Sequence, residues 1–177
     1  MEFFNQNPEI VARDLLGKII VRKFNGKFNG NELRAKIVET EAYFDEKDPA
    51  SRARKNGDLR NTMLMQAGTI LIYGVHNSWL INIVTEEKGK ASAVLIRAIE
   101  PLNFNERCNG PGLLTKALKI DKSFHKQNIL NNKEIWIENF DKNNKIEIVE
   151  SFRIGVKKDL PKKLRFYIKN NKFISRK

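Results

Sequence analysis

The stretch GTILIYGVHNSWLINIVTEEKGKASAVLIRAIEP, residues 68–101, constrains the fold most because it alternates strand-like runs with short polar turns. Its three runs, Thr69–Tyr73, Trp79–Thr85 and Ala91–Ile99, are rich in residues that favour strands. GVHNS joins the first two runs as a projecting hairpin tip, and EEKGK joins the second to the third. Strands separated by such turns favour a largely antiparallel, mixed core.

The run NPEIVARDLLGK near the N-terminus predicts a short helix. Asn7 can cap its start, Pro8 suits its first turn, and Gly17 suits its end. The expected buried stripe of this helix consists of Ile10, Val11, Leu15 and part of Leu16.

Further short elements complete the chain, which shows no internal repeat and no long linker. Turn signals in NGK and NGN, within residues 25–31, separate two early strands. DPASRARKNG, RNTMLMQAG and LLTKALKI predict short helical segments. The additional strands are expected at Lys18–Phe24, Leu33–Tyr43, Glu134–Glu138, Lys145–Val156 and Leu164–Ile168.

The charge of the chain favours a polyanionic partner. Its 33 Lys and Arg residues outnumber 21 Asp and Glu residues, for a formal net charge of +12. Proteins this basic commonly bind nucleic acid, although lysine-rich surfaces also serve solubility. The single cysteine, Cys108, excludes an internal disulfide framework and fits the cytoplasm. We expect neither a membrane span nor a secretory signal, because no apolar run approaches the roughly 18–20 residues that cross a bilayer.

Metal chemistry has little support in the sequence. His76 and His125 lie far apart, and Cys108 has no partner cysteine, so no zinc-ligand spacing appears. The glycines of NGPG, residues 109–112, could turn a helix N-terminus toward phosphate, but they also fit a simple tight loop.

The run KIVETEAY, Lys36–Tyr43, raises the question of why a strand carries two carboxylates and a tyrosine in a row. At period two, one face holds Ile37, Glu39, Glu41 and Tyr43, and the other holds Val38, Thr40 and Ala42. The acids either pair with surface lysines or include a general base that activates water. A tyrosine beside that base could stack a nucleobase. The pattern does not choose between Glu39 and Glu41.

The hairpin tip and one buried arginine are further candidates. Tyr73, Val75 and His76 could form a wedge that enters the minor groove and unstacks a base step, unless Tyr73 packs on the core. Arg97 lies in the apolar run AVLIRAIEP and needs a carboxylate or carbonyl partner there. Glu39 and Glu41 are its candidate partners, unless Arg97 points to solvent or to phosphate.

Several of these motifs occur together in one known family. ARDLLGKIIVR, IVETEAY, DPAS, RN, IYG, NIVT, AVLIRAIEP, NGPG and RIGV followed by LRFY appear here in that family's order. Over nearly its whole length the chain resembles the alkyladenine-type, or 3-methyladenine, DNA glycosylases of base-excision repair. The resemblance implies an enzyme that flips alkylated or deaminated purines out of duplex DNA and hydrolyses the N-glycosidic bond.

We therefore expect residues 1–177 to form a single DNA glycosylase domain of mixed α+β class. It should have a curved, mostly antiparallel, barrel-like β core with short peripheral helices and a projecting β-hairpin. The resemblance further implies a cytoplasmic, nucleoid-associated monomer that needs no cofactor or metal and has no membrane partner.

The resemblance also assigns roles to individual residues. Glu41 becomes the general base, and the side chain of Arg97 and the main-chain carbonyl of Ile154 hold the attacking water. Tyr43 becomes one wall of the base pocket, and Tyr73 fills the gap left by the flipped nucleotide. No lysine or N-terminal amine need attack the sugar, so no lyase activity is expected.

Three further residues follow from the same resemblance. Asn82 matches an asparagine that helps reject guanine by its exocyclic amine. Arg60 and Lys116 are expected to contact the DNA backbone, where lysine and arginine supply affinity.

Two departures from the family pattern concern the base pocket. Arg52, in DPASRA, stands where the family carries a histidine that stacks on the flipped base. A guanidinium can stack too, but its charge should favour neutral lesions, hypoxanthine or ethenoadenine, over cationic 3-methyladenine and 7-methylguanine. Alternatively, Arg52 turns to a phosphate. In addition, Ile70 or Leu71 stands near an expected aromatic residue, and the spacing from Tyr73 to Asn82 is longer than the family's.

The altered pocket leaves an alternative function, a catalytically weak damage-binding protein on the same fold. The presence of both Glu41 and Arg97 favours the enzyme.

Overall fold

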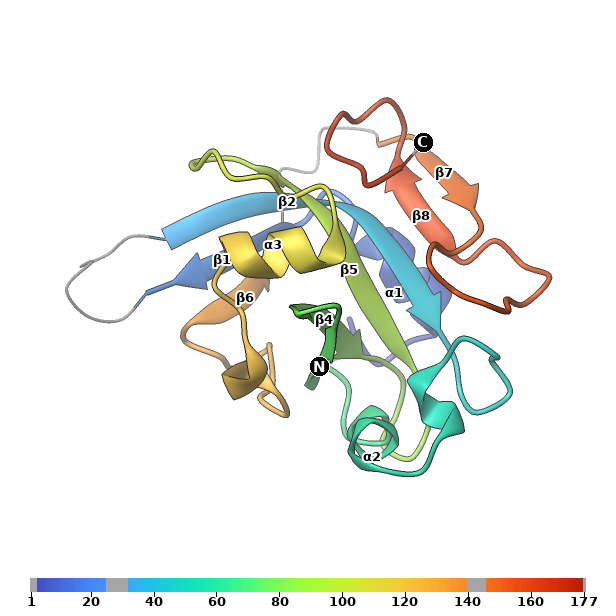
Figure 1. Ribbon diagram of the computed structural model, residues 1–177. Coiled ribbons are helices and arrows are strands. Elements are labelled where there is room, and N and C mark those ends of the chain that lie inside the picture. The colour runs from blue at the N-terminus through green and yellow to red at the C-terminus, as the bar shows by residue number, and fades with distance from the viewer. Residues whose placement is uncertain (1–2, 25–31, 140–145, 177) are drawn as a thin grey trace.

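Two long antiparallel strands, β2 (Glu32–Tyr43) and β5 (Ala93–Pro101), form the centre of a curled sheet in the computed structural model (Figure 1). The structure describes residues 3–24, 32–139 and 146–176. The predicted NGK and NGN turns and Lys145 lie outside the described residues. The other strands are β1 (Ile19–Lys23), β3 (Ile70–Val75), β4 (Ser78–Val84), β6 (Ile135–Glu138), β7 (Ile148–Ser151) and β8 (Arg165–Ile168).

The eight strands form one sheet in which every named pairing is antiparallel. The order is β3-β4-β5-β2-β1-β6, and a branch of β8 and β7 joins at β2. The first half of β2 pairs with β1 and its second half pairs with β8, so the sheet divides along this strand. With its few short helices, this curled sheet confirms the predicted α+β class.

The helices are short and lie around the sheet (Figure 1). They are α1 (Pro8–Asp14), α2 (Asp58–Met63), α3 (Pro111–Ala117) and two 3-10 turns, η1 (Arg52–Arg54) and η2 (Lys122–Phe124). In α1, Asn7 caps the first turn by accepting the Glu9 amide, as predicted. The prediction that Ile10 is buried is wrong, since this side chain is 46% exposed and the helix turns it to solvent.

The runs Thr69–Tyr73, Trp79–Thr85 and Ala91–Ile99 form β3, β4 and β5, as predicted. The connection between β3 and β4 is tighter than the predicted GVHNS tip, because Val75 already pairs with Ser78. Only His76 and Asn77 remain in the turn, with φ of 47° and 58°. Two consecutive residues at positive φ are typical of a type I′ hairpin turn, which matches the natural twist of the strands.

A pair of bulges changes the facing pattern of β2. Across it, the register partners are Ile37 and Ile99, Glu39 and Ala98, and Thr40 and Ile96. Val38 and Arg97 are therefore the extra residues of the two strands. Ile37 packs in the main core, whereas Val38 lies with Ala98 on the opposite face. The prediction that Ile37 shares a face with Glu39 and Glu41 is wrong, because the bulge shifts the alternation by one residue.

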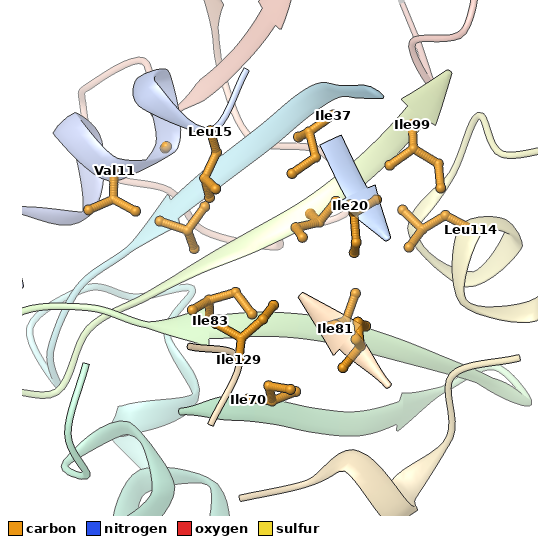
Figure 2. Close-up of a cluster of buried hydrophobic side chains, with 14 of the residues drawn as sticks. Val11, Leu15, Ile20, Ile37, Ile70, Ile81, Ile83, Ile99, Leu114 and Ile129 are labelled. Atoms are coloured by element: carbon orange, nitrogen blue, oxygen red, sulfur yellow. The ribbon is translucent and has the colours of Figure 1, made fainter. Parts of the chain in front are cut away.

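The main core lies between the sheet, α1 and α3. Figure 2 shows Val11 of α1 and Leu15, which directly follows this helix, at one side of the cluster and Leu114 of α3 at another, with strand residues between them. Ile70 is part of this cluster and has no exposed surface. Among the described residues, no helix is long and apolar enough to cross a membrane.

Candidate active site

An open cleft of about 1300 Å³ lies beside the β3–β4 hairpin, where β2 ends. Its lining comes from residues 49–52 and 54–59, the hairpin, the start of α3, residues 154–158, and Tyr43, Leu95 and Arg97. The exposed basic residues of this lining are Arg52, Arg54, Lys55, Lys157 and Lys158, and its acidic residue is Asp58. The entrance is therefore strongly positive, as a surface that receives a polyanion requires.

Glu41 has no exposed surface and lies one layer behind the cleft. Within the described part of the chain its hydrogen-bond partners are Tyr43, Arg97 and Ile154, and all of them line the cleft. The Ile154 amide donates to Oε1 at 2.7 Å, the Tyr43 hydroxyl donates to Oε2 at 2.8 Å, and Arg97 Nη1 lies 3.3 Å from Oε2. The structure thus brings the predicted catalytic residues together, with the Ile154 carbonyl 3.4 Å from Arg97 Nη1.

Burial raises the pKa of Glu41 above its ordinary value of 4.5. The positive charge of Arg97 and the hydrogen bonds from Ile154 and Tyr43 oppose this rise, while the nearby charge of Glu39 adds to it. A carboxylate with a raised pKa is a stronger base than an exposed one, which suits proton abstraction from water.

A second carboxylate, Glu39, lies behind Arg97 and is also fully buried. Arg165 Nε lies 2.6 Å and Arg97 Nε 3.3 Å from its Oε1. Two carboxylates and two guanidiniums therefore balance in charge beneath the cleft. Such compensation is required because an unpaired buried charge is strongly destabilising.

Arg153 forms a separate buried charge centre beside the cleft. Its Nη1 and Nη2 donate to the two oxygens of Asp48 at 2.6 and 2.7 Å, and its Nε donates to Asp159 at 2.9 Å. Burial disfavours the charged carboxylate, but hydrogen bonds from Arg153 and two backbone amides lower the pKa of Asp48 below its ordinary 3.8. The Arg153 guanidinium also lies 4.5 Å from the ring centre of Tyr43 and so supports this wall of the cleft.

The hairpin brings its three predicted wedge residues, Tyr73, Val75 and His76, to the cleft. The Arg52 guanidinium lies 4.6 Å from the ring centre of Tyr73, in stacking range. Burial raises the pKa of Tyr73, while the charge of Arg52 and hydrogen bonds with Arg52 and Asn82 oppose the rise. Arg52 therefore adds positive charge to the cleft lining beside Tyr73.

Two predicted pocket residues do not line the cleft. The Ile70 prediction is wrong, because strand alternation turns this side chain into the main core (Figure 2). Its neighbour Leu71 faces the other way and packs in a small cluster against Tyr73. Asn82 is buried beneath Tyr73 and donates to the Leu71 carbonyl at 3.2 Å.

The two residues predicted to contact the DNA backbone lie outside the cleft lining. Arg60 is partly engaged within the protein, donating to the Ala53 carbonyl at 3.1 Å and lying 3.7 Å from Glu46. Lys116 is exposed on α3.

Sequence reasoning missed the residues that contact the site from distant parts of the chain. Arg165 gives the same signal as Arg97, an arginine among apolar strand residues, and could have been found that way. The basic residues of RARK and VKK were visible as charge runs, but nothing in the sequence placed both on one cleft. Among the described residues, no group of three His, Cys, Asp or Glu side chains could hold a metal ion.

Comparisons with known proteins show the family of this chain. A family model described as methylpurine-DNA glycosylase matches residues 2–172. Proteins named "Putative 3-methyladenine DNA glycosylase" are similar over almost their full length. The one from Aeropyrum pernix is 39% identical, covering 98% of this chain and 91% of that protein. The one from Borrelia garinii is 42% identical, covering 98% and 97%. The one from Clostridium perfringens strain 13 is 36% identical, covering 99% and 98%.

Proposed function

This chain belongs to the methylpurine-DNA glycosylase family, and from that premise we propose that it is a monofunctional DNA glycosylase. It flips alkylated or deaminated purines out of duplex DNA and hydrolyses the N-glycosidic bond with a water activated by Glu41. The observation that carries this proposal is the buried Glu41 carboxylate, whose three hydrogen-bond partners all line a basic cleft.

The proposed reaction places a water between Glu41, Arg97 and the Ile154 carbonyl. Within the described part of the chain, Oε1 of Glu41 accepts one hydrogen bond, from Ile154, so a lone pair remains for a proton of the water. The water oxygen bonds to C1′ of the sugar while the bond from C1′ to the base nitrogen breaks. The water proton passes to Glu41, and the base leaves with the bonding electron pair. The products are the free base and an abasic site.

The hairpin supplies the base-flipping step. Tyr73 and Val75 of β3 and His76 of the two-residue turn lie at the cleft, so they can occupy the space of an extruded nucleotide. Flipping costs a few kcal/mol and costs least for a weakly paired base, which contributes to selectivity. Tyr43 would then stack on the extruded base inside the cleft.

Phosphate contacts come chiefly from the cleft entrance. Arg54, Lys55, Lys157 and Lys158 are exposed there on two separate segments, so they can reach the backbone on both sides of a flipped nucleotide. Lys116 adds a more distant contact from α3.

Release of free base from a duplex with one hypoxanthine or one 7-methylguanine tests the function. Wild type should release the base and leave the strand intact until alkali is added, and Glu41→Gln should bind the duplex without releasing base. Binding by wild type without any release would instead establish the alternative, a damage-binding protein on this fold. Strand cleavage without alkali, or borohydride trapping of a covalent complex, would contradict the monofunctional assignment.

Arg52 carries the proposed preference for neutral lesions. Its guanidinium stacks on Tyr73 at the cleft, where it would meet the flipped base. Single-turnover excision of hypoxanthine and 7-methylguanine should be compared for wild type and Arg52→His. The histidine variant should shift the rate ratio toward 7-methylguanine by about 3- to 30-fold, in line with cation–π energies. An unchanged ratio would refute the charge argument.

A further inference from the structure

The proposed reaction leaves one buried carboxylate without a role. Glu39 has no exposed surface, yet three of the residues that the structure describes, Arg165, Ser175 and Arg97, donate hydrogen bonds to it. Arg165 Nε and Ser175 Oγ lie 2.6 and 2.8 Å from Oε1, and the Ser175 amide lies 2.6 Å from Oε2. The fourth contact is Arg97 Nε at 3.3 Å, which links Glu39 to the proposed water-holding arginine.

Ser175 reaches this carboxylate from the C-terminal segment, residues 169–176. Ile174 packs against Val38 and Ala98 on the outer face of the bulged strands. The carbonyl of Arg176 accepts a hydrogen bond from Arg165 Nη2. The segment is therefore fixed on both sides of Ser175, and its serine is held in place by packing as well as by hydrogen bonds.

The serine hydroxyl contacts both charges at once. It donates to Glu39, and it lies 3.4 Å from Arg97 Nη2, from which it can accept. Arg97 is thus held by Glu39 and Ser175 on one side, and by Glu41 and the Ile154 carbonyl on the other.

The contacts of Arg165 and Ser175 with Glu39 affect the contact between Arg97 and Glu41, because these buried charges balance as a group. Because Arg165 and Ser175 satisfy most of Glu39, Arg97 is not drawn fully to that carboxylate, and its Nη1 remains directed at Glu41. Without them, Arg97 would be the main partner of two buried carboxylates, and its contact with Glu41 would weaken.

We propose that Glu39 and Ser175 are positioning residues of the active site, which makes the C-terminal segment a working part of it. They orient Arg97 toward Glu41 and the proposed water. The inference rests on the proposed function, and its residues act through Arg97 rather than on the substrate. The family match ends at residue 172, so it does not cover Ser175.

The pH dependence of base release distinguishes a positioning role from a purely structural one. A residue that only stabilises the fold should not change this dependence. The charged and titratable groups around Glu41 are Arg97, Tyr43, Glu39 and Arg165, its register partner on β8. The charge of Glu39 raises the pKa of Glu41, and Arg97 opposes that rise. A change behind Arg97 should therefore move the acid limb of the rate profile.

The test compares Ser175→Ala, Ser175→Thr and Glu39→Gln in single-turnover base release across pH. Ser123→Ala is the matched control, because Ser123 lies in η2, outside the cleft lining. Ser175→Ala should slow the chemical step about 10-fold, as for a lost hydrogen bond to a charged group, and move the acid limb to higher pH. Its affinity for the lesion duplex should not change. Ser175→Thr, which keeps the hydroxyl, should recover most of the rate.

Glu39→Gln keeps the shape of the side chain and removes its charge, so it should move the acid limb to lower pH. If Ser175→Ala keeps the wild-type rate and pH profile, the inference is overturned, whatever happens to its thermal unfolding. If Ser175→Ala does not fold, the test rests on Glu39→Gln and Ser175→Thr. An acid limb that does not move in Glu39→Gln then overturns the inference. Wild type without base release would refute the proposed function itself, so the two failures are distinguishable.

Discussion

Asp48 meets Arg153 through two short hydrogen bonds of 2.6 and 2.7 Å, whereas Glu41 meets Arg97 through a single contact of 3.3 Å. Both carboxylates are buried beside the same cleft. The tight pair lowers the pKa of Asp48, and the loose pair leaves the pKa of Glu41 raised. One fold therefore holds two buried carboxylates in different ways. The bidentate pair fixes structure, whereas the weaker pairing of Glu41 with its arginine leaves Glu41 more basic, as its proposed role requires.

The largest expected effect is a loss of activity at Glu41 without a loss of stability. Glu41→Gln should slow base release about 10²- to 10⁴-fold, the usual contribution of a general base. The raised folded-state pKa means that ionised Glu41 costs stability, and this cost appears as pH rises from the ordinary 4.5 through the folded-state value. At pH 7 the variant should therefore unfold at the same temperature as wild type or higher, as thermal unfolding would show. A clearly lower unfolding temperature would show that the Glu41 carboxylate stabilises the fold, as Asp48 does.

Asp48→Asn should show the reverse pattern. Removing one partner of a buried pair costs roughly 3–5 kcal/mol, so the free energy of unfolding in urea should fall by this order at pH 7. The folded-state pKa of Asp48 is lowered, so its stabilisation is present above the ordinary 3.8 and is lost as pH falls through the folded-state value. The gap between variant and wild type should close there. A variant as stable as wild type at pH 7 would show that Asp159 alone can hold Arg153.

Tyr43→Phe should remove one of the two short hydrogen bonds that Glu41 accepts. The Tyr43 hydroxyl donates to Oε2 at 2.8 Å, and hydrogen bonding favours the charged carboxylate. Its loss should raise the pKa of Glu41 and move the acid limb of base release about 1–2 pH units higher. Single-turnover rates across pH measure this shift, and a limb that moves to lower pH would contradict the assignment of Glu41 as the base.

The smallest effect should come from the exposed charges of the cleft entrance. Lys158→Ala should weaken binding to all duplexes alike and reduce the salt slope of the affinity by about 0.9, as for one lost phosphate contact. Lys133→Ala, exposed but outside the cleft lining, is the control. Titrations at several salt concentrations measure the slopes, and equal slopes for the two variants would remove Lys158 from the DNA surface.

The sequence predicted the strands and helices well. It predicted less well which side chains of a strand face the core and which face the cleft. The runs that became β3, β4 and β5 carry strong local signals, since both strand propensity and turn residues agree. The exchange of faces at Ile37 and Val38 depends on a bulge, which the regular alternation of the sequence conceals. Ile70 was misplaced because one residue along a strand decides between core and cleft.

At the candidate active site, residues close together in the sequence were easier to predict than partners that lie far apart in it. Glu39 and Glu41 could be identified as a pair with Arg97, but local patterns could not rank them. Nothing in the sequence marked Arg165 and Ser175 as partners of Glu39, because the pairing of β8 with β2 brings Arg165 near it and the packing of the C-terminal segment brings Ser175. Long-range partners of this kind leave no periodic signal.

The bulged residues Val38 and Arg97 have a consequence for changes in chain length. Each strand carries one extra residue, and the two excesses cancel, so the register beyond them resumes at its earlier offset. A single bulge bends its strand, but two facing each other keep both strands in step. Loss of one residue from β2 alone would therefore leave the excess of β5 uncompensated and bend the sheet behind the cleft. In this part of the molecule, insertions and deletions in the two strands are expected to be tolerated only in pairs.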